Sequence, residues 1–119
     1  MTGEPAFFEL GVADPARGRT FYEGLFGWHF EAGPSGGEGF LIRTPTLPGG
    51  IHGGDQGGGP YLFFGVDDMP TALDRVRELG GTTEEDLERD PEVIAAFGHF
   101  VLCRDDQGSP FGLHQPPAR

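Results

Sequence analysis

The sequence predicts an α+β fold of two tandem βαβββ modules within a single domain of 119 residues. The first observation is a repeat, because the segment Phe7–Asp14 returns 54 residues later as Tyr61–Asp68, with Gly11 matching Gly65. The second is that both copies continue in the same way, with an acidic turn, an amphipathic stretch and a glycine. That order is typical of a strand, a helix cap, a helix and a helix end. A repeat of this kind predicts that both halves fold alike.

The elements of the first half follow in order. Phe7–Val12 is a short apolar run rich in aromatic and β-branched residues, which favours a strand. Asp14 is a good N-cap, Pro15 suits the first helical position, and Gly27 is expected to end the helix. Three shorter strands are expected after it, at Trp28–Glu31, Phe40–Arg43 and Gly50–His52.

The second half has the same expected order. Tyr61–Val66 predicts a strand, and a helix is expected from Asp68 and Pro70 to the stop at Gly80. The acidic segment Glu84–Glu92 is interpreted as a solvated loop or a short helical turn. The remaining expected strands are Thr82–Glu84, Gly98–Cys103 and Phe111–Gln115.

The domain organisation follows from the distribution of glycine. The modules are expected at residues 1–55 and 60–117, and the glycine-rich stretch 53–60 is interpreted as their linker. The chain has 22 Gly and 11 Pro, and this organisation assigns many of them to turns and helix ends.

Composition limits the classes of function. The chain has 19 acidic and 8 basic residues, a net charge of −11, and no lysine. These features argue against a nucleic-acid partner and exclude Schiff-base chemistry on a lysine side chain. No apolar run is long enough for a membrane span and no signal-peptide pattern is present, so no membrane partner is expected. The single cysteine, Cys103, has no internal disulfide partner, which predicts a cytoplasmic location.

Four segments together resemble the vicinal oxygen chelate superfamily, which includes glyoxalase I, extradiol dioxygenases, methylmalonyl-CoA epimerase, fosfomycin-resistance enzymes and bleomycin-resistance proteins. They are Asp14–Trp28, Val66–Asp68, Leu79–Gly81 and Asp105–Leu113. The resemblance implies that each module curls a mixed sheet into half a cup, that paired modules enclose a site, and that two chains form a homodimer.

The resemblance also implies where a metal would be held. Metal-dependent members carry a His early in the first strand of each module and a Glu on the last strand. Matched by motif, those positions fall on Phe7, Gly50, Tyr61 and Gly112. Phe and Gly offer no ligand atom and a phenol is a poor one, so no metal or other cofactor is expected. The alternative is a relocated divalent-metal site on Glu9, His52 and His114.

Strand alternation extends this face to neighbouring residues. The expected ligand-binding residues are Phe7, Glu9, His52, Tyr61, Phe63 and His114. If the protein is an enzyme, the catalytic candidates are His52, His114 and Glu9, since imidazole titrates near neutrality. The alternative is that both histidines are ordinary strand residues and that the aromatic residues belong to the core. Arg43 is a candidate partner for Glu9, and Trp28 is expected to serve packing.

Three functional hypotheses follow. The first is a metal-free small-molecule-binding protein of the bleomycin-resistance type, whose ligand is expected to be cationic or aromatic. The net charge of −11 favours a cationic ligand. The second is a glyoxalase-like lyase, isomerase or dioxygenase acting on a small oxygenated substrate. The third is a non-catalytic partner domain with a vestigial cup.

Overall fold

A computed structural model describes residues 3–33, 38–86 and 90–117, and these residues form eight strands and three helices. The predicted α+β class is confirmed. The chain divides into two units. The first unit is Phe7–Leu62. The second unit consists of the residues from Phe63 onward together with those that precede Phe7. Within the described ranges, no helix is both long and apolar enough to cross a membrane.

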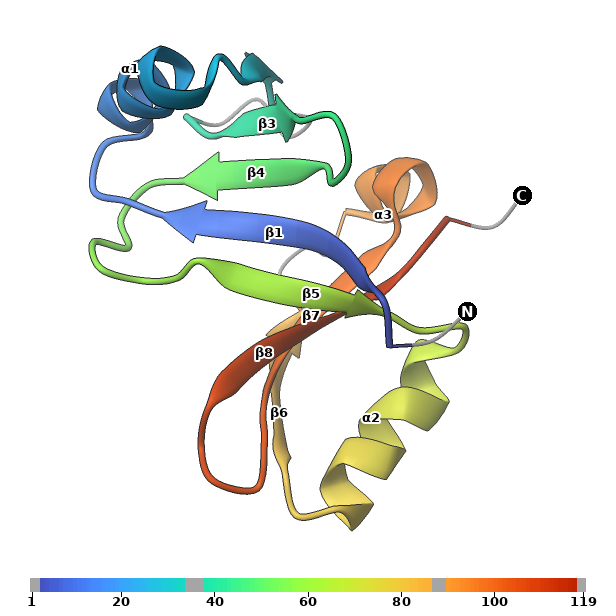
Figure 1. Cartoon of the computed structure of the whole chain (residues 1–119). Helices are drawn as coiled ribbons and strands as arrows, with labels where there is room; N and C mark the ends of the chain where they lie inside the picture. Colours follow the sequence, from blue (N-terminus) through green and yellow to red (C-terminus); the bar gives the residue numbers. More distant parts are fainter. Residues whose placement is uncertain (1–2, 34–37, 87–89, 118–119) are drawn as a thin grey trace. The chain divides into compact units, whose positions relative to one another are not determined.

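The first unit contains one helix and four paired strands (Figure 1). Its strands lie in the order β2-β3-β4-β1, with β1 parallel to β4 and the other neighbours antiparallel. The elements are β1 (Pro5–Gly11), α1 (Pro15–Phe26), β2 (His29–Ala32), β3 (Phe40–Arg43) and β4 (Gly49–His52). The predicted bounds of β3 are confirmed, and those of the other strands differ by one or two residues.

The ends of α1 form as the sequence predicts. A carboxylate oxygen of Asp14 accepts hydrogen bonds from the backbone N–H groups of Ala16 and Arg17, at 3.0 and 3.3 Å. This satisfies two of the donors that the first turn of a helix leaves without partners. Gly27 ends the helix in the left-handed region, with φ of 71°.

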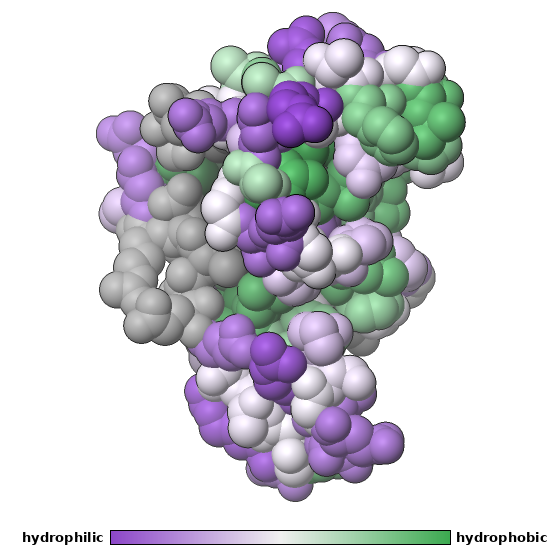
Figure 2. Space-filling view, turned by 90° about the vertical axis from the view of Figure 1, so that its left-hand side faces the viewer, coloured by the Kyte–Doolittle hydropathy of each residue, from purple (hydrophilic) through white to green (hydrophobic). Residues whose placement is uncertain are grey.

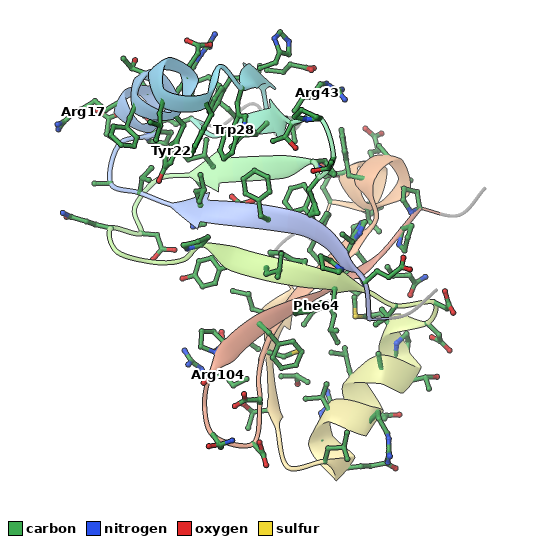
Figure 3. The ribbon with its side chains drawn as sticks, in the orientation of Figure 1. Arg17, Tyr22, Trp28, Arg43, Phe64 and Arg104 are labelled. Atoms are coloured by element: carbon green, nitrogen blue, oxygen red, sulfur yellow. The ribbon has the colours of Figure 1, made fainter. Side chains whose placement is uncertain are left out.

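The core of the first unit lies between its strands and α1. Its buried residues are Leu10, Phe30, Ile42 and Ile51. Tyr22 and Trp28 pack against them (Figure 3). The Trp28 ring is stacked on Phe26, with 4.7 Å between the ring centroids. Trp28 therefore serves packing, as expected. Because Leu10 faces this core, its neighbours on β1 lie on the opposite face of the strand.

The second unit has the same kind of sheet, with strands in the order β5-β8-β7-β6 and β5 parallel to β8. The elements are β5 (Tyr61–Gly65), α2 (Met69–Glu78), β6 (Thr82–Asp86), α3 (Pro91–Phe97), β7 (His99–Arg104) and β8 (Pro110–Gln115). The first two residues of β5, Tyr61 and Leu62, belong to the first unit. Its core of Val66, Met69, Val101, Cys103 and Leu113 packs against α2. The Cys103 side chain is fully buried, and burial raises the pKa of its thiol to about 11, so it is an inert thiol.

The acidic segment, interpreted as a solvated loop or a short helical turn, contains the end of a strand and the start of a short helix. It begins as part of β6, and a seven-residue helix, α3, starts at Pro91 and runs beyond the expected end of the segment. Asp90 supplies the cap, accepting a hydrogen bond from the N–H of Glu92 at 2.9 Å. Val93 and Ile94 give α3 partly buried side chains. Residues 87–89 of the segment lie outside the described residues.

Helix α1 carries large apolar side chains on its solvent side. Phe21, Leu25 and Phe26 are 61%, 58% and 55% exposed. Figure 2 shows a hydrophobic area at the height that α1 has in Figure 1. Arg17 of the same helix projects away from the strands (Figure 3).

Candidate functional site

The candidate site lies on the face of β1 and β4 that is opposite α1. In the register of these parallel strands, Glu9 is paired with Gly50, and Gly11 with His52. Leu10 and Ile51 occupy the core face, so Glu9 and His52 point the other way. This agrees with the side-chain direction that strand alternation predicts.

His52 is held between two carboxylates. Its Nδ1 lies 2.6 Å from Oε2 of Glu9, and its Nε2 lies 2.9 Å from Oδ2 of Asp55. The hydrogen bond with Glu9 is the main cause that raises the pKa of His52 to about 9, assisted by Asp55 and opposed by burial. At neutral pH the ring is therefore an imidazolium that donates both of its N–H groups.

Asp55 comes from the connection between β4 and β5, and it links the Tyr61 hydroxyl to His52. The same oxygen, Oδ2, accepts a hydrogen bond from the Tyr61 hydroxyl at 3.1 Å. The hydrogen bond with His52 is the main cause that lowers the pKa of Asp55, and the Tyr61 hydroxyl adds to it. We name Glu9, His52, Asp55 and Tyr61 the histidine cluster.

Two glycines make room for the Asp55 carboxylate. A Cβ atom on Gly11 would lie 2.3 Å from Oδ2, and one on Gly58 would lie 2.2 Å from Oδ1. The backbone N–H of Asp55 donates to the carbonyl of Val12 at 3.0 Å, which fixes the segment against β1. The stretch 53–60 was interpreted as a linker, so sequence reasoning missed Asp55. The sequence feature that could have identified Asp55 is a lone carboxylate among glycines, three residues after His52.

The histidine cluster is accessible to a small molecule. The side chains of Glu9, His52 and Asp55 are 19%, 40% and 34% exposed. The ring of Tyr61 is nearly parallel to that of His52, with 6.4 Å between the ring centroids. A hollow of about 290 Å³ lies at the start of α1, and its lining includes Gly11, Asp14, Arg17 and Gln56 but no residue of the histidine cluster.

The structure places the predicted site residues in two groups. Glu9, His52 and Tyr61 come together, and Phe7 is a partly buried residue on the same strand face as Glu9. Phe63 and His114 belong to the second unit, where they form a cluster of their own.

The expected partner of Glu9 was wrong. Arg43 forms its ion pair with Glu31 across the antiparallel strands β2 and β3. The register sets Arg43 opposite His29, two positions from Glu31, within diagonal reach of a long side chain. Figure 3 shows Arg43 at the end of β3. Glu9 is instead paired with His52.

Phe63 and His114 have the environment of packed residues. Phe63 is only 1% exposed, and Phe100 meets its ring edge-on at 5.4 Å. His114 stacks on Phe100 at 4.2 Å, and its Nε2 lies 2.9 Å from the backbone carbonyl of Phe97, at the end of α3. Burial lowers the pKa of His114, so the neutral ring donates Nε2–H to that carbonyl. This arrangement favours the structural interpretation of His114.

The residues present do not fit a metal held in the superfamily's usual way. A Cβ on Gly50 would lie 2.5 Å from a Glu9 oxygen, and one on Gly112 would lie 2.2 Å from the Phe63 ring, so other side chains occupy both positions. In the histidine cluster the two carboxylates approach opposite ring nitrogens, and one imidazole cannot present both nitrogens to one ion. Across residues 3–33, 38–86 and 90–117, no three His, Cys, Asp or Glu side chains are grouped so that they could hold a metal ion.

Comparison with known proteins gives relatives in several bacteria. The anthracycline biosynthesis protein DauV of Streptomyces sp. (strain C5) is 28% identical over 131 residues, which cover 93% of this chain and 46% of DauV. The putative glyoxylase CFP32 of Mycobacterium tuberculosis is 27% identical over 128 residues, covering 95% of this chain and 46% of that protein. This chain thus spans about half the length of these curated relatives.

Solved structures share the fold at lower identity. Methylmalonyl-CoA epimerase from Mycobacterium tuberculosis superposes with a TM-score of 0.66 at 16% identity, covering 97% of this chain and 89% of the epimerase. A superfamily member from Vibrio splendidus 12B01 gives a TM-score of 0.63 at 15% identity, over 92% of this chain and 96% of the other. A family model for the glyoxalase-like domain matches residues 7–114. The chain therefore belongs to the glyoxalase-like domain family, within the glyoxalase, bleomycin-resistance and dioxygenase (vicinal oxygen chelate) superfamily.

Proposed function

We propose that this protein binds a small organic ligand without a metal, at the histidine cluster of its first unit. The observation that carries the proposal is the hydrogen-bonded contact of His52 with Glu9 and Asp55, on a face that remains partly exposed. Charged groups in a hydrogen-bonded network, next to an aromatic ring, are features of a site that orients a small molecule. Sequestration of the bleomycin-resistance type is the biological form that we propose for this binding.

The surroundings of the cluster support an organic ligand. The Tyr61 ring offers an aromatic surface beside the partly exposed His52. The names of the relatives, an anthracycline biosynthesis protein and a putative glyoxylase, also refer to small organic molecules.

The test is a ligand panel on protein treated with a chelator. It holds cationic, neutral and carboxylate-bearing aromatic compounds, and the melting temperature is read for wild type, His52→Gln and His29→Gln. His29 is a matched control because its side chain is 71% exposed and lies outside the cluster. At least one compound should stabilise wild type and His29→Gln but not His52→Gln. No stabilisation by any compound, or stabilisation only after a divalent metal is added, would contradict the proposal.

Trp28 is a poor reporter for this binding. It packs on the α1 side of the sheet, whereas the histidine cluster lies on the other face. Tyrosine fluorescence of Tyr61 or calorimetry suits the site better than tryptophan quenching.

A second candidate is acid–base catalysis on a small oxygenated substrate, as in a glyoxalase-like lyase or isomerase. The chain of contacts from Tyr61 through Asp55 and His52 to Glu9 favours it, because such a chain can hold and move a proton. As an imidazolium, His52 would act as the acid. Turnover of a ligand from the panel, lost in His52→Gln, would favour this candidate over binding alone.

A further inference from the structure

We propose that His52 and Tyr61 form a two-donor site for a negatively charged oxygen of the ligand, a carboxylate or an enolate, and that Asp55 fills this site until the ligand displaces it. This inference rests on the proposed function, because it states which chemistry the bound ligand carries.

The geometry is that of two donors converging on one atom. Nε2 of His52 and the hydroxyl of Tyr61 lie 2.9 and 3.1 Å from the same oxygen, Oδ2 of Asp55. Two donors aimed at one point, one of them positively charged, bind an oxygen that carries negative charge better than a neutral one. The atom that occupies this point is a carboxylate oxygen of the protein itself.

The orientation of His52 does not depend on Asp55. Its other nitrogen, Nδ1, contacts Glu9 at 2.6 Å, and the backbone of Glu9 is fixed in the register of β1 with β4. When Asp55 leaves, Nε2–H therefore keeps its direction. A donor that is already oriented loses little entropy when it binds a ligand.

Asp55 can leave without unfolding its segment. Its side chain is 34% exposed, so rotation about its own side-chain bonds can carry the carboxylate into solvent. The backbone contacts stay in place, because the N–H of Asp55 donates to Val12 and its carbonyl accepts from Gly58. The space that remains lies against Gly11, which has no side chain of its own, and beside the backbone carbonyl of Gly58.

Charge favours an anionic oxygen over a cation at this point. The groups that face His52 are Glu9 from β1, Asp55 from the connecting segment and Tyr61 from β5. A ligand carboxylate that replaces Asp55 keeps the imidazolium between two negative charges. A ligand cation placed there would face two donors, the N–H of the imidazolium and the O–H of Tyr61. The net charge of −11 acts over longer range and is screened by salt.

The experiment vacates the oxygen position and offers it a small carboxylate. Acetate is titrated against Asp55→Ala at pH 7, with chloride at equal ionic strength as the reference, and the melting temperature is recorded. We expect saturable stabilisation, with a rise of about 5 °C at about ten times the dissociation constant of acetate. Asp106→Ala is the matched control, because it removes the same charge from an exposed turn of the second unit. Wild type and Asp106→Ala should respond to acetate much less.

Two further variants identify the donors and guard against a folding defect. Tyr61→Phe, combined with Asp55→Ala, removes one donor and should weaken acetate binding about tenfold. Asp55→Asn keeps the size of the side chain but lacks its charge, and acetate should displace it more readily than it displaces Asp55. An equal acetate effect in Asp106→Ala, or none in either Asp55 variant, would overturn the proposal.

The same experiment separates this proposal from the proposed function. If acetate does not stabilise the Asp55 variants but a cationic compound stabilises wild type, the oxygen site is wrong and ligand binding stands. If acetate stabilises Asp55→Ala while no compound of the panel stabilises wild type, the oxygen site stands and the proposed function fails.

Discussion

His52 and His114 occupy corresponding register positions, opposite Gly11 of β1 and Gly65 of β5, but their surroundings shift their pKa values in opposite directions. Two carboxylates raise the pKa of His52, whereas burial beside Phe100 lowers that of His114. A duplicated strand pair thus carries a charged histidine in one unit and a neutral one in the other.

His52 should make the protein less stable at alkaline pH. Its pKa rises from 6.5 in the unfolded chain to about 9 in the folded one. Its contribution to the free energy of unfolding is therefore complete below pH 6.5 and is lost as pH rises through 9. Because the side chain is 40% exposed, we expect a loss of about 1 kcal/mol after allowing for solvent screening. Urea unfolding at pH 6 and pH 9.5 measures it.

The two histidine variants separate this effect from other titrations. His52→Gln should lack this part of the alkaline loss, and His29→Gln should retain it. Equal losses of stability between pH 6 and pH 9.5 in wild type and His52→Gln would show that folding does not raise the pKa of His52.

His114 should make the protein less stable at acidic pH. Its pKa in the folded protein lies below 6.5, so its contribution is present above pH 6.5 and is lost as pH falls through the folded value. His114→Phe removes the titrating group and retains a ring against Phe100. The free energy of unfolding of wild type should fall more steeply between pH 7 and pH 5 than that of the variant, and parallel slopes would contradict the assignment.

Alanine at Gly50 and at Gly112 should have unequal costs. At Gly112 the new Cβ would lie 2.2 Å from the ring of Phe63, which is 1% exposed and cannot move aside. At Gly50 it would lie 2.5 Å from the end of the Glu9 side chain, which can turn away. We expect about 2–3 kcal/mol for Gly112→Ala and less than about 1 kcal/mol for Gly50→Ala.

The pKa of His52 distinguishes the Gly50→Ala variant from the Gly112→Ala variant. Gly50→Ala should lower it, because Glu9 moves, and Gly112→Ala should leave it unchanged. Chemical denaturation and a histidine NMR titration give the two readings. A Gly50 variant that is as unstable as the Gly112 variant would show that Glu9 is rigidly packed.

The homodimer and the cytoplasmic location remain predictions of the sequence. Sedimentation equilibrium tests the dimer, which should have twice the chain mass of 12.8 kDa. A monomer across the micromolar range would contradict it.

The sequence predicted local elements and side-chain faces better than it predicted long-range partners. The alternation of Phe7–Val12 and Gly50–His52 was enough to set Glu9 and His52 on one face, because a strand reverses side-chain direction at every residue. Asp55 was missed because its position depends on close approach to Gly11, which is 44 residues away. Arg43 was considered as a partner for Glu9 because the pairing of β2 with β3 cannot be read from either strand alone.

The extent of α3 was underestimated for a different reason. Its cap pair, Asp90 and Pro91, repeats the Asp14 and Pro15 of α1, but the acidic composition of the preceding residues limited the interpretation to a loop or a short helical turn. Seven residues are also too few to show the helical spacing of apolar side chains clearly.

The most direct test of a metal-free histidine cluster is an NMR titration of the His52 ring, first in chelator-treated protein and then with stoichiometric Zn²⁺, Ni²⁺, Mn²⁺ or Fe²⁺. We predict that His52 keeps its proton up to a pKa of about 9 and that the metals do not change its signals at pH 7. Titration near pH 6.5, or loss of the ring proton at neutral pH when one of these metals is added, would contradict the site described for this protein.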